Sequence, residues 1–377
     1  MDDLIYFDNA ATTFPKPACV KEVIHDCISH YCANPGRSSH RLSIKASESV
    51  YLCRERLADF FGGEPENTVF TSSATHSVNL ALKSFLKQGE HVLISDFEHN
   101  AVLRPIAALS EKGLITYDFY RSDLEGEELE CELRSKVKNN TTLICACHRS
   151  NVCSLTSKIA DIGRFCQKNG IFFLVDASQS AGILQLDSKC QGIDFLCAPA
   201  HKGLYGIPGC GFVILSERAV QSGNLTTFTE GGNGVDSLSP FMPEALPEKF
   251  EAGTLPLPAI CGLSAGIDFV SKIGIEGIRR HEDRLCAITS YGLSKIKRIK
   301  IHSGSGVVLF SVNGIPSEGF AYELAKRGIC VRAGLHCAPL AHKRLETLPD
   351  GAVRISFSAF NSEKEVKKFL DTCKALL

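Results

Sequence analysis

The sequence predicts an α/β fold with a mostly parallel sheet covered by helices on both faces. From about residue 40 to 215, segments with helical periodicity alternate with short apolar runs. Strands that alternate with helices favour parallel pairing, because a parallel strand is reached through a crossover, usually a helix. Residues 221–259 interrupt the pattern with five of the fifteen prolines, and a second series of helices and strands follows.

Three helices and six strands are predicted in the first series. The apolar residues of 43–61 and of 74–86 recur three or four positions apart, as in amphipathic helices. A further helix is predicted over 156–170, which begins with a capping Thr and ends with Gly. Short apolar runs predict strands at 91–95, 114–119, 141–147, 171–177, 193–198 and 211–215.

The second series is shorter and less regular. One long helical stretch is predicted over about 260–299, followed by strands at 307–312 and 352–358 with a helix near 317–327 between them. A final helix closes the chain, and Ser362 and Glu365 stand at the spacing of a capping box at its start.

Composition limits the kinds of partner that the chain is expected to have. The 377 residues are 44% hydrophobic and 22% charged, with a formal net charge of −1, as in an ordinary globular protein. This charge argues against binding to nucleic acid or to anionic lipid. The acidic start "MDDLIYF" does not resemble a signal peptide, and no apolar run approaches roughly 18 residues. We expect a cytoplasmic protein with no membrane and no nucleic-acid partner.

The seventeen cysteines do not form a regular pattern. Their odd number and scattered positions do not suit a secreted disulfide framework. A metal site around Cys145, Cys147, His148 and Cys153 is the alternative, but the spacing matches no zinc pattern and a strand would point alternate residues to opposite faces. We therefore expect no metal, and most cysteines as small buried hydrophobic residues.

Polar residues follow the predicted strands at the points where ligands bind in α/β sheets. Small hydroxyl residues at 71–77 open a helix, whose free N–H groups and dipole attract anions. The other strand ends carry Glu98, His99 and Asn100; His148, Ser150 and Asn151; Asp176, Ser178 and Gln179; and His201 with Lys202.

Taken singly, most of these residues have ordinary structural explanations. Thr71–Thr75 and Asp176 suit helix caps or turns, and His99 could be a surface or core histidine. Lys202 is harder to explain, because it follows an apolar segment and precedes the glycine-rich "GLYGIPGCG". A lysine in such a place is costly unless its ammonium is paired or used chemically. An anion-binding helix start, a carboxylate and a desolvated lysine together suit pyridoxal phosphate (PLP).

Eight segments resemble the class V aminotransferase family, and within it the branch of cysteine desulfurases and selenocysteine lyases. They are "YFDNAATTFPKP", "VFTSSATHSVNLAL", "FEHNAVLRP", "HRSNVCS", "LVDASQSAG", "FLCAPAHKGLYGIPGCG", "KFEAGTLPLPAI" and "VRAGLHCAPL". The resemblance runs from residue 6 to about 360. It implies a fold-type I PLP-dependent transferase that acts as a homodimer, with a seven-stranded type of large sheet. It also implies a large PLP-binding domain over 15–254 and a smaller α+β domain, formed by 1–14 and 255–377, which carries a catalytic cysteine loop.

The resemblance implies how this chain holds PLP. Lys202 matches the lysine that forms a covalent Schiff base with PLP, and Asp176 matches the partner of the pyridine nitrogen. Gln179 matches the donor to the ring phenolate, and His99 matches the histidine stacked on the ring, which is also the candidate for moving protons.

Further positions match ligands of the PLP phosphate, namely Ala74, Thr75, His201 and, from the other subunit, Thr254. Pro199 and Ala200 depart from the family pattern, in which Ser or Thr is frequent, so one phosphate contact is expected to be missing or replaced.

The resemblance also implies a substrate site. Asn151, next to the cofactor, and Arg354 match the residues that hold the substrate carboxylate, and Arg332 is a further candidate. Cys337 matches the nucleophile that takes sulfur from the substrate. It follows a glycine turn among positive charges, which favour a thiolate.

These matches imply conversion of L-cysteine to L-alanine, with sulfur carried as a persulfide on Cys337. "LHCAP" resembles the short-loop group of desulfurases, which commonly pass the persulfide to a dedicated acceptor protein. The alternatives are a selenocysteine lyase, another class V aminotransferase or β-lyase, and a PLP-binding protein without turnover.

Overall fold

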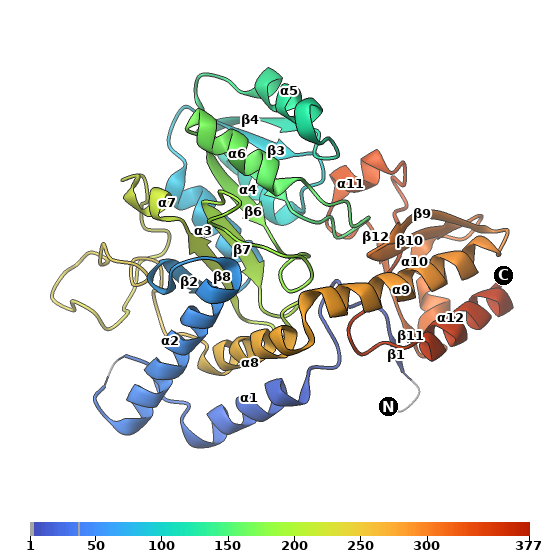
Figure 1. The fold of residues 1–377 in the computed structure, drawn as a ribbon, viewed down its shortest axis with the longest axis horizontal. Coiled ribbons are helices and arrows are strands. Elements are labelled where there is room, and N and C mark those ends of the chain that lie inside the picture. The colour runs from blue at the N-terminus through green and yellow to red at the C-terminus, as the bar shows by residue number, and fades with distance from the viewer. Residues whose placement is uncertain (1–3, 37) are drawn as a thin grey trace.

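A computed structural model describes residues 4–36 and 38–377. Its centre is a seven-stranded sheet (Figure 1). In spatial order the strands are β2 (Thr68–Thr71), β8 (Gly211–Leu215), β7 (Phe195–Pro199), β6 (Phe172–Asp176), β5 (Thr141–Cys147), β3 (Glu90–Ser95) and β4 (Ile115–Tyr120). Among these, β8 runs antiparallel to both neighbours, and the pairs from β7 to β4 are all parallel. The predicted mostly parallel sheet is confirmed.

Helices cover both faces of this sheet, and alternate strand residues pack into two separate cores. In β6, Phe173 and Val175 join one core while Leu174 joins the other. The first core contains residues of α1 (Ala18–His30), α2 (Arg41–Phe61), α5 (Gly126–Lys136), α6 (Ile159–Asn169) and α8 (Leu257–Ile273). The second contains residues of α3 (Ala74–Phe85), α4 (Asn100–Glu111) and α7 (Glu217–Gln221).

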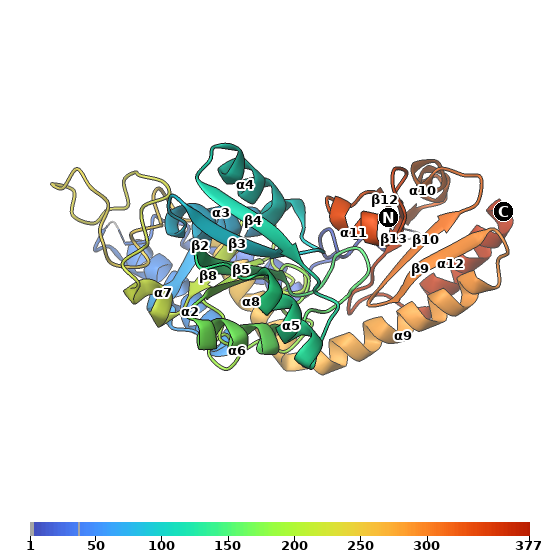
Figure 2. The same cartoon turned by 90° about the horizontal axis from the view of Figure 1, so that it is seen from above.

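A smaller four-stranded antiparallel sheet lies at the other end of the molecule (Figure 2). Its order is β12 (Arg332–Gly334), β13 (Ala352–Ile355), β10 (Val307–Val312) and β9 (Ile299–Ser305). With it pack α9 (Ile275–Ser294), α10 (Ser317–Ala325) and α12 (Glu363–Leu376), whose start has the predicted capping box. The short α11 (Pro339–Arg344) follows β12.

The N-terminal segment belongs to the core of this smaller part. β1 (Ile5–Tyr6) pairs in parallel with β11 (Ile329–Cys330), and Phe7 packs in the same core as α9 and α12. α8 instead packs on the larger sheet, with α1 and α2. The boundaries at 14/15 and 254/255 therefore stay predictions.

The predicted helical stretch over 260–299 is two helices. α8 and α9 meet at a bend of 79°. Gly274 lies between them with φ +86, a conformation that glycine adopts without a side-chain penalty, and its N–H ends α8 by donating to the Val270 carbonyl. The last predicted helical residue, 299, begins strand β9 instead.

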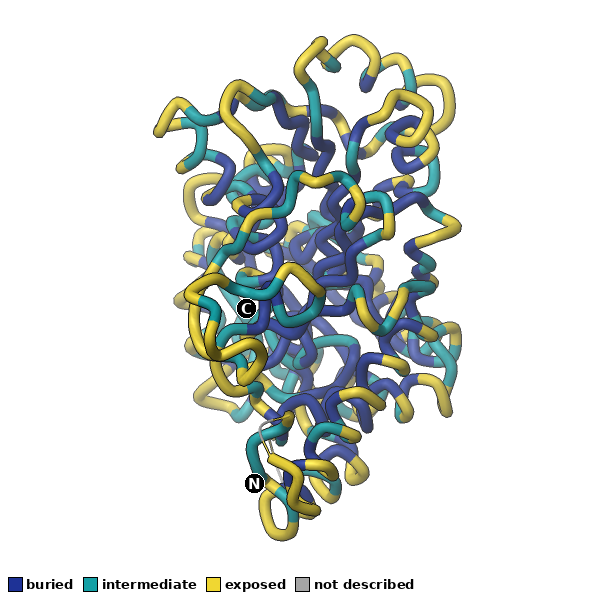
Figure 3. Tube along the Cα trace, turned by 90° about the vertical axis from the view of Figure 1, so that its left-hand side faces the viewer, coloured by how far each residue is buried: buried dark blue, intermediate teal, exposed yellow. Residues whose placement is uncertain are grey.

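Residues 222–256 form a long irregular segment between α7 and α8, as predicted. Leu238 is 99% exposed and Phe241 81% exposed on it. Figure 3 shows buried chain through the middle of the molecule and exposed chain around its periphery.

No single helix in the described part of the chain is long and apolar enough to cross a membrane. The bent pair α8–α9 meets the length and composition criteria together, but α8 lies largely buried in the first core.

Candidate active site

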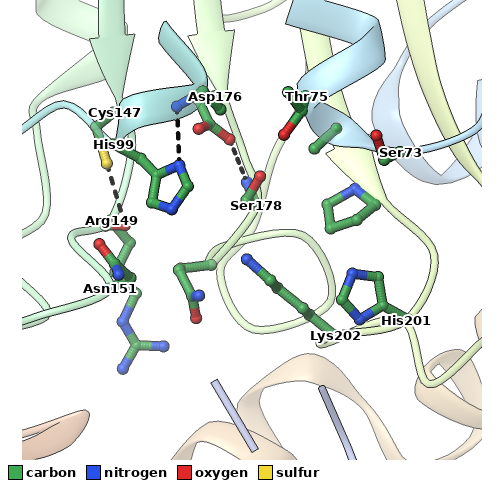
Figure 4. A pocket seen from close by; sticks show the side chains of 14 residues that line it. Ser73, Thr75, His99, Cys147, Arg149, Asn151, Asp176, Ser178, His201 and Lys202 are labelled. Carbon is green, nitrogen blue, oxygen red and sulfur yellow. Dashed lines mark hydrogen bonds between the residues drawn. The ribbon is translucent and has the colours of Figure 1, made fainter. Parts of the chain in front are cut away.

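An open cavity lies at the carboxyl ends of β5, β6 and β7, next to the start of α3 (Figure 4). Its lining residues are Ser73, Ala74, Thr75, His99, Ala101, Cys147, Arg149, Asn151, Asp176, Ser178, Gln179, Pro199, His201 and Lys202. The cavity thus brings together every predicted cofactor-binding residue except Thr254. Parallel strands end at one edge, which is why residues far apart in sequence converge here.

The start of α3 forms one wall of the cavity. Ser73 caps the helix by accepting a hydrogen bond from the His76 N–H at 3.2 Å. A side chain at Gly211 would meet the Ser73 backbone at 2.6 Å, so β8 packs directly against the start of α3. The N–H groups of a helix start favour an anion, and Ala74 and Thr75 are the first residues of this helix.

His201 lies beside this wall with one nitrogen unused. Its Nδ1 is buried and has no hydrogen-bond partner among the described residues. Burial, followed by the charges of Lys202 and Lys16, lowers the pKa of His201 to about 4. The ring is neutral at pH 7, so it carries one N–H that it can donate to an anion.

Lys202 and Asp176 face the cavity from neighbouring strand ends. Burial lowers the pKa of Lys202 to about 8, although the Asp176 carboxylate acts in the opposite direction. Asp176 Oδ1 accepts the Ser178 N–H at 2.9 Å, which orients the carboxylate. The peptide carbonyl of Lys202 accepts a bond from the Thr13 hydroxyl at 3.2 Å. Because the pKa of its side chain is lowered to about 8, a substantial fraction of Lys202 is the neutral amine near pH 7.5.

His99 is the N-cap residue of α4. Its Nδ1 accepts the Ala101 N–H at 3.0 Å, and burial lowers its pKa (Figure 4). Because Nδ1 accepts, the network assigns the proton of the neutral ring to Nε2, the nitrogen on the side away from the helix.

Arg354 connects the smaller sheet to the edge of the cavity. Its Nη1 donates to the Asn151 carbonyl at 3.0 Å and its Nη2 to Asp8 at 2.9 Å. Its Nε is buried and has no partner among the described residues. Arg332 lies opposite Arg354 in the neighbouring strand. The predicted substrate-binding arginines therefore lie together on the smaller sheet, although neither lines the cavity itself.

Cys337 also lies outside the lining of the cavity, but its loop is bound to the cavity rim. The Asn100 N–H donates to the Cys337 carbonyl, and Asn151 Nδ2 donates to the His336 carbonyl, both at 2.8 Å. The Cys337 side chain is exposed.

Two predicted cofactor-binding residues are not placed to make the contacts that their predicted roles require. Thr254 is exposed on the irregular segment outside the cavity, where its predicted role requires a second copy of the chain. Gln179 lines the cavity, but its Nε2 donates to the Ala10 carbonyl at 2.8 Å. The Gln179 side chain must therefore rotate before its Nε2 can donate to the phenolate of the PLP ring, as predicted.

Arg149 was not predicted from the sequence as a site residue, and no role was predicted for Glu98. Arg149 lines the cavity within a segment already noted for its polar residues, but the direction of its side chain cannot be read from sequence. Glu98 is buried next to the site, where Ser95 donates to its Oε1 at 2.7 Å. Burial, with the nearby Asp176 charge, raises the pKa of Glu98 to about 8.

No group of three or more His, Cys, Asp or Glu side chains suited to a metal ion occurs within residues 4–36 and 38–377. Cys145 packs in the second core, whereas Cys153 packs beside Val152 in a separate small cluster.

The sheet order, with a lysine, an aspartate and a helix start at the carboxyl ends of its strands, is the architecture of fold-type I enzymes. A family model described as "Aminotransferase class-V" matches residues 5–369, and the chain belongs to this family. Its members are PLP enzymes, and the lysine, carboxylate, unpartnered His201 nitrogen and helix start fit this cofactor.

Individual relatives give a closer comparison. The chain is 32% identical to a probable cysteine desulfurase of Pyrococcus abyssi, over 100% of this chain and 94% of the relative. The apo structure of a cysteine desulfurase from Thermococcus onnurineus matches with a TM-score of 0.91 and 32% identity, over 100% of this chain and 95% of that one. The cysteine desulfurase CsdA of Escherichia coli, with a TM-score of 0.88 and 24% identity over 99% and 94%, shares the fold.

Proposed function

We propose that this protein is a PLP-dependent cysteine desulfurase that converts L-cysteine to L-alanine and collects the sulfur as a persulfide on Cys337. The two hydrogen bonds from Asn100 and Asn151 carry the proposal, because they attach the Cys337 loop to the rim of a pocket suited to PLP. A protein that only bound PLP would have no use for an exposed cysteine tied to that rim.

Lys202 is the proposed Schiff-base residue, and its lowered pKa supports this role because the neutral amine is the nucleophile. Asp176 is proposed to hold the proton of the pyridine nitrogen. His99 is proposed to stack on the ring and Gln179 to donate to its phenolate. When bound, PLP supplies an electron sink that stabilises negative charge on the substrate.

The phosphate is proposed to bind at the start of α3 through Ala74 and Thr75, with the unused nitrogen of His201 as a further donor. Thr254 of a second copy of the chain is proposed to complete this site. Pro199 and Ala200, at the end of β7, offer no side-chain donor to the phosphate.

Arg354 is proposed to hold the substrate carboxylate with Asn151, and its buried, unpartnered Nε is the donor still available. Arg332 adds positive charge beside it. This anchors the α-carbon end of the substrate and leaves the sulfur end for Cys337.

The transfer of sulfur from the substrate to Cys337 requires no external oxidant. The Cys337 thiolate attacks the substrate sulfur, the new S–S bond forms, and the carbon–sulfur bond breaks with its electron pair left on the carbon side. Protonation of that carbon gives alanine, and the neutral Nε2–H of His99 is the proposed proton donor.

The proposed assembly is a homodimer that passes the persulfide to an acceptor protein. The exposed Leu238 and Phe241 support a second copy on the irregular segment. A cytoplasmic location suits this chemistry, because a reducing compartment keeps Cys337 as a thiol.

Replacement of Cys337 tests the proposal. We expect Cys337→Ala and Cys337→Ser to lower alanine formation from cysteine more than about 100-fold, because each removes the nucleophile. Both variants should retain bound PLP, measured by its visible absorbance. Alanine and persulfide are followed together, with selenocysteine and cysteine sulfinate assayed beside cysteine.

Undiminished persulfide formation by Cys337→Ala would contradict the role of Cys337. A wild-type protein that turns over selenocysteine but not cysteine would instead identify a selenocysteine lyase, and consumption of a keto acid would identify a transaminase.

A further inference from the structure

The loop that carries Cys337 has an unfavourable backbone conformation. His336 has φ +51 and Cys337 has φ +56, and neither is glycine. Two consecutive side-chain-bearing residues in the left-handed region are disfavoured by contacts between the Cβ atom and the backbone. Bonds from outside the turn must therefore hold it.

Two of those bonds come from segments that follow strands of the larger sheet, α4 and the loop after β5, and both hold peptide carbonyls. The Asn100 N–H binds the Cys337 carbonyl and Asn151 Nδ2 binds the His336 carbonyl. Neither bond fixes the imidazole of His336, which is buried beneath the turn.

The His336 ring is bound instead by a line of side chains in and just after α11. His336 Nδ1 lies 3.0 Å from His342 Nε2, with 13° between the ring planes. On the other side of His342, Nδ1 lies 2.7 Å from the Thr347 hydroxyl oxygen. All three side chains are buried.

Both imidazoles are neutral at pH 7. Burial, with the Arg354 charge second, lowers the pKa of His336 to about 2, and burial lowers the pKa of His342 to about 4. Each ring therefore carries one N–H, and one proton lies between the two rings.

The line of side chains can carry its protons in two ways. In one, the Thr347 hydroxyl donates to His342 Nδ1, His342 Nε2–H donates to His336 Nδ1, and His336 Nε2–H points to the Arg332 carbonyl at 3.5 Å. In the other, the Thr347 hydroxyl donates to the His342 carbonyl at 3.3 Å and accepts from His342 Nδ1–H, and His336 Nδ1–H donates to His342 Nε2. In both, Thr347 is bonded to His342 Nδ1 and fixes the orientation of the His342 ring, which in turn fixes the His336 ring.

We infer that His342 and Thr347 are positioning residues for Cys337, which lock the His336 ring and so the left-handed turn that presents the cysteine sulfur. They touch neither the cofactor pocket nor the reacting atoms. The inference rests on the proposed role of Cys337 as nucleophile.

The test compares Thr347→Val, which removes the hydroxyl but keeps the shape, with Thr347→Ser, which keeps the hydroxyl. In the holoenzyme we expect T347V to lower kcat about tenfold, because small displacements of a reacting group are costly. KM for cysteine and the bound-PLP absorbance should not change. Hydrogen exchange of the peptide covering 335–342 should be about tenfold faster, as expected for a loosened turn. T347S should match the wild type.

His302→Gln is the matched control. This histidine lies nearby on β9, where its Nε2 is 2.9 Å from the Ser311 hydroxyl, outside the line of bonds to the loop. In the His302→Gln variant, kcat and the hydrogen exchange of the peptide covering 335–342 should be those of the wild type.

Wild-type kcat and exchange in T347V would overturn the inference, as would equal losses in T347V and T347S. The exchange measurement is also made with Thr347→Val in a Cys337→Ala background. Faster exchange there supports the positioning role even if Cys337→Ala proves active, so failure of the proposed function can be recognised separately.

Discussion

At the scale of single residues, the protonation of Lys202 is expected to control the proposed formation of its Schiff base with PLP. The structure places this lysine where burial disfavours the ammonium, and Asp176 opposes the effect only in part. With a pKa of about 8, roughly a tenth of the amine is neutral at pH 7, and this fraction can react with an aldehyde without first losing a tightly held proton.

This predicts how PLP uptake by the apoprotein depends on pH. Uptake should rise with pH and reach half its maximal rate near pH 8, rather than near the ordinary lysine pKa of 10.5, because the neutral amine is the reactive form. The growth of the Schiff-base absorbance after mixing measures the rate at each pH.

Asp176→Asn provides the comparison. The Asp176 charge raises the pKa of Lys202, so its removal should move the midpoint to lower pH. A midpoint that stays near 10.5 in the wild type would contradict the assignment of Lys202.

At the scale of elements, the strands and their polar ends could be predicted because their signals are local. The apolar run of β6 and the residues that follow it are consecutive in sequence, and parallel strands bring such ends together. The resemblance to a known family supplied the roles proposed for these positions.

Other elements could not be predicted, because long-range contacts determine them. β1 and β11 are two residues each, too short to show a periodicity, and each is completed by the other. The turn at Cys337 is held by Asn100, Asn151 and His342, and no sequence pattern joins these positions. The break at Gly274 could not be predicted either, because a single glycine inside a helical pattern is tolerated.

A buried ion pair fixes the end of the irregular segment. Arg54 of α2 contacts Glu251 at 2.5 Å, and Glu251 also accepts the Phe70 N–H at 2.7 Å. We expect Glu251→Ala to lower the free energy of unfolding by about 3 kcal/mol, because it leaves a buried charge unpaired. Urea denaturation measures the change.

Glu130→Ala is the control for this prediction. Glu130 pairs with Arg134 on α5 and both side chains are about half exposed, so its removal should cost less than about 1 kcal/mol. Equal losses of the free energy of unfolding in the two variants would contradict a larger contribution of the buried Arg54–Glu251 pair.

At the scale of the whole molecule, the proposed dimer depends on a segment that one copy leaves largely uncovered. We expect Leu238→Asp with Phe241→Asp to shift the protein toward monomer and to lower bound PLP, because charges oppose apolar burial at an interface. Sedimentation velocity and the cofactor absorbance measure the two effects.

Tyr322→Asp is the matched control for an exposed aromatic residue, on α10 of the smaller part. It should leave both measurements unchanged. A double variant that sediments like the wild type would contradict an interface through Leu238 and Phe241.

The N-terminal strand also has a consequence for synthesis on the ribosome. Asp8 is made 346 residues before Arg354, the side chain that it orients. At typical elongation rates this separation lasts about 20–70 s, for most of which β1 has no strand to pair with. The proposed carboxylate-binding site is therefore completed only after residue 354 has been made, so we expect a shorter nascent chain to lack the proposed activity.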